Sequence, residues 1–445
     1  MVSSASSDSF EMSTPGSPIL SKGSMQLPRW AKVDKFTGSG STRKVMLAAG
    51  AAVALLFIVF GVSQASGSSF KSMRAESYHK EKARDPINDV YNRTLGFEKI
   101  FVINMPSRSD LRDSMALAAG FSNLTVEFID GVHLDEVDEM MLPTEHPDIE
   151  KMRSKSLGNL GSWRAHMNAV RAIVEQNLGS ALILEADVDW DIRIHDQMYD
   201  FAKAARLLVQ PTEGPTSTFL DPTYPRSREG EEHQDFVVNQ YKVSTPTTSP
   251  YGDIDRWDMH WLGHCGMNFP TSKNPKVKLP LGRAIIPNDN TTVAPNHFRK
   301  DWGGAELIDQ YPPHTRVVTR ARNNVCTLAY ALSQQGARNV IWELGLRKMN
   351  SPFDIMLRDV CDGTSDRPMS ICLSLQPQLF QHHLPVGKTM SNIHNHIDSK
   401  PRKKAETSNI RVSVKTNLKN LVRGKMGDEL IDSFPDPEEL SEGPK

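Results

Sequence analysis

The sequence predicts an α/β domain with a largely parallel sheet, preceded by one helix that spans a membrane. Three observations support this prediction. Short apolar strands alternate with helical segments from about residue 99 onward, a long uncharged segment lies near the N-terminus, and acidic residues follow one buried strand directly. The chain has 445 residues and a net charge of −1. This suits one large domain with tails and gives no support for a nucleic-acid partner.

The uncharged segment, "VMLAAGAAVALLFIVFGV", runs from Val45 to Val62. As a helix it would be about 27 Å long, close to the hydrocarbon thickness of a bilayer. The alternatives are a buried core helix and a cleaved signal peptide. The segment has no polar face, and its N-terminal flank is much longer than that of a usual signal peptide. We therefore interpret residues 45–64 as an uncleaved signal anchor.

The charges around this segment predict its orientation. Arg43 and Lys44 precede it directly, whereas neutral residues follow it. The positive-inside rule then leaves residues 1–44, rich in Ser, Gly and Pro, in the cytosol as a disordered tail. The remainder of the chain lies in the lumen of the secretory pathway, so we expect a single-pass type II membrane protein.

Two features of the luminal part agree with this topology. The four cysteines lie there and permit two disulfides in any of three pairings: Cys265, Cys326, Cys361 and Cys372. Three N-glycosylation acceptors also lie there: Asn92, Asn123 and Asn290.

The elements follow in order along the luminal part. A polar stem over residues 65–95 leads into the strand "KIFVINMP", a helix, and the strand "LTVEFIDGV". The helix "SWRAHMNAVRAIVEQN" and the strand "SALILEADV" come next. Residues 210–256 are dense in Pro, Gly and Thr and are predicted to form a long loop or insertion. We expect the domain to cover residues 96–390 and residues 391–445 to be a loosely structured tail.

Four acidic residues lie at alternate positions from the end of the apolar run "ALIL" onward: Glu185, Asp187, Asp189 and Asp191. Alternate residues of an extended chain share a face, and ligands bind beyond the C-terminal ends of parallel strands. Hard oxygen ligands there suit Mg²⁺ or Mn²⁺, particularly when a diphosphate supplies the remaining ligands. An acidic surface turn is the alternative. A phosphatase with a nucleophilic aspartate does not fit, because the first acid is a glutamate.

A pair of histidines provides a further candidate ligand. His382 and His383 follow an apolar strand near the end of the domain. Adjacent side chains of a strand face opposite sides, so at most one of them would face the cation. The alternative is that both are surface residues.

Two further segments are candidates for binding phosphate. Gly158 and Gly161 precede a helix whose first turns contain His166, and a helix N-terminus favours an anion. Arg108 and Arg112 are four residues apart on another helix, so they would share a face and grip a diphosphate. A solvated helix face is the alternative for the arginines.

These segments occur in one order, which resembles glycosyltransferase family 25, especially its fungal members. The motifs that carry the resemblance are "INMPSR", "GNLGSWRAHM", "ALILEADVDWD", "WDMHWLGHCG", "HTRVV", "VCTLAYALSQQGAR", "PFDIML" and "QPQLFQHH". They extend over about Lys99 to His383.

The resemblance implies a fold and an activity. The fold is GT-A-like and Rossmann-related, with a mostly parallel sheet flanked by helices. The activity is a Mn²⁺-dependent, inverting transfer of a hexose, usually galactose, from a UDP-sugar to a hydroxyl of a glycan or glycoprotein. The Golgi lumen, or that of the endoplasmic reticulum, is the expected compartment.

The resemblance also implies roles for particular residues. Glu185 and Asp187 match the acids of the family's metal motif, and His383 matches its C-terminal histidine region. With Asp189 they are the expected metal ligands. Asp354 in "PFDIML" matches a recurrent acid and is our candidate for the base that deprotonates the acceptor. Gly158, Gly161 and His166 match the glycine-and-histidine motif. Independently of the resemblance, Trp190, Trp261 or His264 are candidates to line the sugar pocket, and the alternative is that they are buried core residues.

One departure opens an alternative function. Ala186 occupies the position where relatives usually have the middle acid of Glu-Asp-Asp. The acids on either side of it remain, so we expect metal binding to persist. The alternative is a catalytically degenerate luminal protein that binds a carbohydrate or a partner.

Overall fold

The computed structural model describes residues 84–148, 159–214, 218–274, 276–298, 303–388 and 400–437. They belong to one compact unit that begins at Lys82. The predicted cytosolic tail, the signal anchor and most of the stem lie outside the described residues, as does Gly158. Among the residues that are described, no helix is long and apolar enough to cross a membrane.

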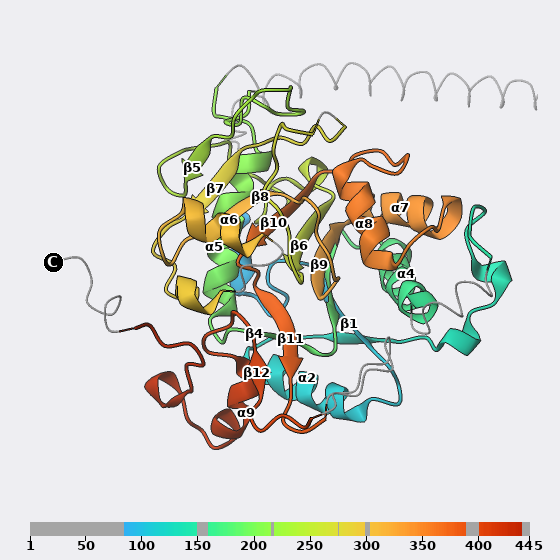
Figure 1. Ribbon diagram of the computed structural model, residues 1–445, viewed down its shortest axis with the longest axis vertical. Helices are drawn as coiled ribbons and strands as arrows, with labels where there is room; N and C mark the ends of the chain where they lie inside the picture. The colour runs from blue at the N-terminus through green and yellow to red at the C-terminus, as the bar shows by residue number, and fades with distance from the viewer. Residues whose placement is uncertain are drawn as a thin grey trace, which may run out of the picture. The chain divides into compact units, whose positions relative to one another are not determined.

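Strands form the centre of the unit (Figure 1). Within the described residues they join into a twelve-stranded sheet. The strands are β1 (Lys99–Asn104), β2 (Glu127–Asp130), β3 (Ser180–Glu185), β4 (Val188–Trp190), β5 (Asp235–Val237), β6 (Met259–Gly263), β7 (Arg283–Ile286), β8 (Arg316–Arg320), β9 (Ala329–Ser333), β10 (Cys372–Gln376), β11 (Phe380–Leu384) and β12 (Glu406–Thr407).

The order of the main sheet is β2-β1-β3-β9-β6-β10-β8-β7-β5, and β11 joins β6, β4 and β12 beside it. β2, β1 and β3 are parallel, as are β6 with β10 and β5 with β7. β9 runs antiparallel to both β3 and β6, and β8 antiparallel to β10 and β7. The predicted α/β architecture is therefore confirmed, with a sheet that mixes both directions.

Helices cover the sheet. The α-helices are α2 (Ser109–Phe121), α4 (Asn159–Glu175), α5 (Ile194–Val209), α6 (Gly304–Gln310), α7 (Gln334–Val340), α8 (Phe353–Asp362) and α9 (Val414–Val422). A π-helix, η6 (Ile341–Arg347), continues α7. Short 3₁₀-helices are η1 (Pro86–Tyr91), η2 (Leu134–Glu136), η3 (Glu139–Met141), η4 (Ile254–Arg256), η5 (Pro295–His297) and η7 (Gly427–Glu429).

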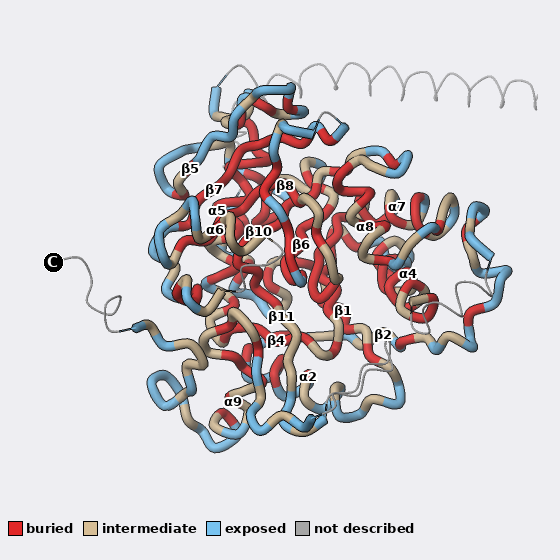
Figure 2. The backbone as a smooth tube through the Cα atoms, viewed as in Figure 1, coloured by how far each residue is buried: buried red, intermediate tan, exposed pale blue. Residues whose placement is uncertain are grey.

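The strands are buried on both faces, as Figure 2 shows for the central ones. On β1, Ile100 and Val102 pack in one apolar cluster with residues of α2 and α5, whereas Phe101 packs in another with residues of α4 and α8. This alternation follows from the two-residue period of a strand. Each fully buried large apolar side chain contributes about 1.5–3 kcal/mol, so the two helical layers hold the sheet between them.

The cysteines pair as Cys265–Cys326 and Cys361–Cys372. This is one of the three pairings that the sequence left open. The expected acceptors Asn92, Asn123 and Asn290 are all exposed. Most of the described part of residues 210–256 is irregular, with only β5 and η4 inside it, as predicted for an insertion.

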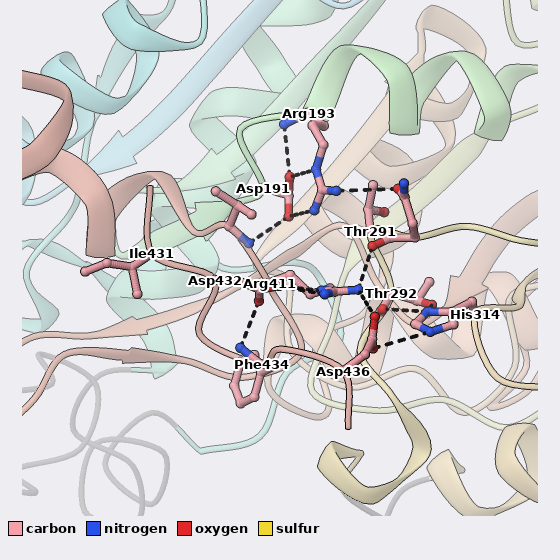
Figure 3. Close-up of polar contacts among 12 residues, drawn as sticks. Asp191, Arg193, Thr291, Thr292, His314, Arg411, Ile431, Asp432, Phe434 and Asp436 are labelled. Atoms are coloured by element: carbon pink, nitrogen blue, oxygen red, sulfur yellow. Dashed lines mark hydrogen bonds and ion pairs between the residues drawn. The ribbon is translucent and has the colours of Figure 1, made fainter. Parts of the chain in front are cut away.

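The C-terminal segment differs from the prediction of a loose tail. β12 pairs with β11, and α9 places Val414 and Leu421 in the core. Figure 3 shows Arg411 of this segment between Asp432 and Asp436, with His314 on the far side of Asp436. The polar composition of residues 400–437 concealed this order, because much of the binding uses ion pairs and hydrogen bonds instead of apolar contacts.

Candidate active site

The acidic stretch lies where β3 ends and the chain turns into β4. The Glu185 amide donates to Leu328 O and the Ala186 amide donates to Ile103 O, which anchors the turn to β9 and β1. β4 then pairs antiparallel with β11, opposing Val188 to His382. The predicted proximity of the acids and the histidine pair is therefore present in the fold.

Asp187 and His382 form the centre of the site. His382 Nδ1 lies 3.4 Å from Asp187 Oδ2, and the two side chains are 38% and 41% exposed, respectively. The loss of water around each group opposes its charged form, but their mutual attraction outweighs it. The attraction between the two groups lowers the pKa of Asp187 to about 2 and raises the pKa of His382 to about 9. Asp187 Oδ1 is buried and has no hydrogen-bond partner among the described residues.

Glu185 is held from the other side. The Thr327 hydroxyl donates to its Oε1 at 2.9 Å, and His166 Nε2 lies 3.5 Å from the same oxygen. His166 is buried, shares a 2.9 Å hydrogen bond with the Tyr330 hydroxyl and stacks on Phe353 at 4.5 Å. His166 therefore orients Glu185 and is not placed on a surface that a donor could reach.

Gly161 has a packing role. A Cβ added to it would lie 2.2 Å from Val132 O, so only glycine allows α4 to approach the chain after β2 this closely. The glycine signal in "GNLG" is therefore explained, at this position, by the contact between two segments of backbone.

Asp189 differs from the predicted metal ligand. It is fully buried, and both its oxygens accept from the protein. Oδ1 accepts from the amides of Trp190 and Lys415, and Oδ2 accepts from the hydroxyls of Thr407 and Ser413. Asp191 is likewise buried and bound by Arg193 through both carboxylate oxygens. These two acids are satisfied without a cation.

His383 also differs from its predicted role. Its Nδ1 lies 2.9 Å from Thr407 Oγ1 and 3.5 Å from Asp189 Oδ2. The expectation that one histidine at most faces the site agrees with this geometry, but the one beside Asp187 is His382.

The aromatic candidates belong to the core. Trp190 is fully buried, donates to Ser122 Oγ at 2.8 Å and meets Phe380 edge-on. Trp261 and His264 are buried as well, bonded to the carbonyls of Cys326 and Leu375. In this structure none of the three is exposed enough to line a sugar pocket.

Arg108 and Arg112 have different partners. Arg108 is paired with Asp110 at 2.7 Å, a bond that raises its pKa, and the charge of Asp187 adds to this effect. Arg108 therefore lies within electrostatic range of the site. Arg112 is exposed and lies over the ring of Phe128, 4.2 Å from its centroid. The predicted joint grip of a diphosphate is not formed here.

Asp354 lies in the first turn of α8. Its Oδ1 accepts from the Ile355 amide and its Oδ2 from the Cys326 amide, each at 2.9 Å. Because Cys326 precedes Thr327, one short segment holds both Asp354 and Glu185. This brings Asp354 into the neighbourhood of the acidic turn.

Lys415 is the functional residue that sequence reasoning missed. It is buried, and its Nζ donates to Ala186 O at 2.9 Å. Burial lowers its pKa, while the charges of Asp189, Asp187 and Asp110 favour its charged form. A lone lysine in a polar segment carries no sequence signal for such a position. The pairing of β12 with β11 brings the segment that contains Lys415 to the site.

The site fits a cation in part. Asp187 Oδ1 is buried without a partner from any residue that the structure describes, so it offers one ligand, and Glu185 is a second carboxylate nearby. Among the described residues, no three carboxylates have ligand atoms within 4.8 Å of one another. The three possible metal ligands that do lie this close together there are Cys265, Cys326 and His382. A cation at Asp187 would therefore need ligands from a bound diphosphate as well.

A family model matches part of the chain. Residues 97–239 match the family model described as glycosyltransferase family 25 (LPS biosynthesis protein). These residues, which contain β1 to β5 and the acidic turn, are similar to glycosyltransferases of family 25, as the motifs predicted, and the match supports a glycosyltransferase class.

Proposed function

We propose that this glycosyltransferase transfers a hexose, galactose in the first instance, from a UDP-sugar to a hydroxyl of a glycan or glycoprotein, with inversion. The family match supports the reaction class. The observation that supports the donor site is the buried Oδ1 of Asp187, which lies beside His382 and has no hydrogen-bond partner in the part of the chain that the structure describes.

Each residue of the site has a part in this proposal. Asp187 and Glu185 would hold Mn²⁺ or Mg²⁺ together with the donor diphosphate, and such a cation offsets negative charge on the departing nucleotide. His382 and Arg108 add positive charge beside Asp187. Asp354 deprotonates the acceptor hydroxyl as a general base. Thr327 and His166 keep Glu185 in position.

We propose that the reaction takes place in the Golgi or endoplasmic reticulum lumen, on a chain anchored by residues 45–64. Two disulfides and three exposed glycosylation acceptors support a luminal environment.

The test uses the full-length chain, purified in mild detergent, with a panel of nucleotide sugars in Mn²⁺ or in chelator. Hydrolysis of one UDP-sugar is expected, lost in chelator and reduced at least a hundredfold in Asp187→Asn. Asp113→Asn, which changes an exposed carboxylate on α2, is the matched control and should retain the rate.

A chain that binds UDP with Mn²⁺ but neither hydrolyses a donor nor glycosylates a broad acceptor panel would contradict this proposal. It would favour the degenerate binding protein instead. Ala186 is the residue that makes this alternative worth testing, because it removes one acid from the motif.

A further inference from the structure

The two disulfides lie in different surroundings. Cys361 and Cys372 are each 1% exposed inside an apolar cluster with residues of α4 and α8. Cys265, in contrast, is exposed, and Cys326 is partly so. A reductant in solution therefore reaches the Cys265–Cys326 bond first.

The exposed disulfide lies against a histidine. Both sulfur atoms and a ring nitrogen of His382 lie within 4.8 Å of one another. Two thiolates and an imidazole are a common ligand set for Zn²⁺, with Zn–S bonds of about 2.3 Å and Zn–N bonds of about 2.0 Å. The two Cα atoms are 5.5 Å apart, so both sulfur atoms reach one tetrahedral ion.

The backbone around the two cysteines is fixed by contacts other than the disulfide. The Cys265 amide donates to Val325 O at 2.9 Å, and the Val325 amide donates to Gly266 O at 3.2 Å. The Trp261 indole donates to Cys326 O, and the Cys326 amide donates to Asp354. These bonds remain when the sulfur–sulfur bond is broken, so the thiols stay close together.

We propose that Cys265, Cys326 and His382 form a second metal site, which is closed as a disulfide and binds Zn²⁺ or a similar thiophilic cation once the disulfide is reduced. A dithiol reductant opens it by thiol–disulfide exchange: the protein disulfide gains two electrons and two protons, and the reductant becomes a disulfide. Binding of Zn²⁺ then releases the two thiol protons, and water takes the fourth position.

The site shares His382 with Asp187, and this gives it a consequence for catalysis. A Zn²⁺ ion on this imidazole would compete with the contact that His382 Nδ1 makes with Asp187 Oδ2 at 3.4 Å. Reduction with Zn²⁺ should then slow the transfer reaction. This last step alone rests on the proposed function; binding of the cation does not.

The experiment uses Co²⁺ as a coloured substitute for Zn²⁺ on the full-length chain. The chain is reduced with a phosphine, and the phosphine is removed under oxygen-free conditions. The reduced chain is then titrated with Co²⁺. One Co²⁺ per reduced chain is expected, with a thiolate-to-cobalt charge-transfer band that Zn²⁺ displaces and that the oxidised chain lacks. The band should disappear in Cys265→Ser. In His382→Gln the affinity for Co²⁺ should fall at least tenfold.

A double variant of the other disulfide, Cys361→Ser with Cys372→Ser, is the matched control and should retain the band. No band in the reduced wild-type chain, or a band that survives Cys265→Ser, would overturn the proposal. A second measurement avoids substitution: Zn²⁺ should protect Cys265 and Cys326 of the reduced wild-type chain from alkylation, as mapped by mass spectrometry. Equal labelling with and without Zn²⁺ would also overturn it.

Donor hydrolysis is measured in the same samples. Co²⁺ binding with loss of hydrolysis on adding Zn²⁺ supports the whole proposal. Co²⁺ binding in a chain that never hydrolyses any donor retains the metal site and contradicts only the proposed function.

Discussion

At the scale of single residues, Asp187 and Asp189 show how neighbours decide the role of a side chain. Both belong to one alternating acidic run. Asp189 is buried among donors from β4, β12 and α9, whereas Asp187 has a buried oxygen with no partner in the described part of the chain. One is therefore a structural acid and the other is open to a ligand.

This difference predicts opposite effects of one substitution. Asp189→Asn removes the charge that several donors bind, so we expect it to lower the free energy of unfolding by about 2–4 kcal/mol. Asp187→Asn breaks a partly exposed ion pair and should cost less than about 1 kcal/mol. Urea unfolding of both variants checks this. Equal losses of stability would contradict the assignment of roles.

His260 offers a prediction for pH. It is fully buried, stacks on Trp257 at 4.1 Å, and neither ring nitrogen has a partner among the described residues. Burial lowers its pKa to about 3 from the model-compound value of 6.5. Between these values the unfolded chain binds a proton that the folded chain does not, so His260 makes stability fall as the pH decreases from 6.5 toward 3.

His260→Phe should remove this contribution. Stability measured by urea unfolding at pH 7, 6 and 5 should then fall less steeply, by up to about 1.4 kcal/mol per pH unit. Asn296→Gln, which changes an exposed amide that does not titrate, supplies the control and should leave the slope unchanged. An unaltered slope in His260→Phe would show that other groups cause the acid sensitivity.

At the scale of elements, the C-terminal segment completes the site. Ser413 caps α9 by accepting from the Thr416 amide, and the same hydroxyl donates to Asp189. The next two residues insert Val414 into the core and Lys415 beneath the acidic turn. A short polar helix is therefore part of the folded domain, held by its contacts and not by its own propensity.

Lys415 tests this element. Lys415→Met removes the buried charge that faces Asp187 and Asp189, so we expect a loss of about 3–5 kcal/mol in the free energy of unfolding. Lys419→Met, on the exposed side of α9, should change stability by less than about 0.5 kcal/mol. Thermal unfolding of the pair measures both. A Lys415 variant as stable as the control would mean that this charge is dispensable.

At the scale of the whole molecule, the proposed luminal location predicts that the chain is glycosylated. Asn92, Asn123 and Asn290 are separate exposed positions on the folded unit. Expressed as the full chain in eukaryotic cells, the protein should carry glycans that an N-glycosidase removes. Each Asn→Gln substitution should remove one step of the mobility shift on a gel. A chain without any glycan would contradict the type II topology.

The sequence by itself determined the α/β class, the strands β1 and β3 and the acidic turn after β3. These depend on local patterns: two-residue periodicity, helical segments and charges at the end of a buried run. It also predicted the similarity to glycosyltransferase family 25, which the match over residues 97–239 supports. Such signals need no knowledge of distant contacts.

Only the tertiary structure decided which acid keeps an oxygen without a partner among the described residues, which histidine lies beside that acid and which cysteines pair. The reason is that each of these depends on groups remote in sequence. Lys415 and Thr407 reach Asp189 from more than 200 residues away, and the register of β4 with β11 turns His382, not His383, toward Asp187. Acidic residues in one run acquire different roles because the fold places hydrogen-bond donors beside some of them and not beside others.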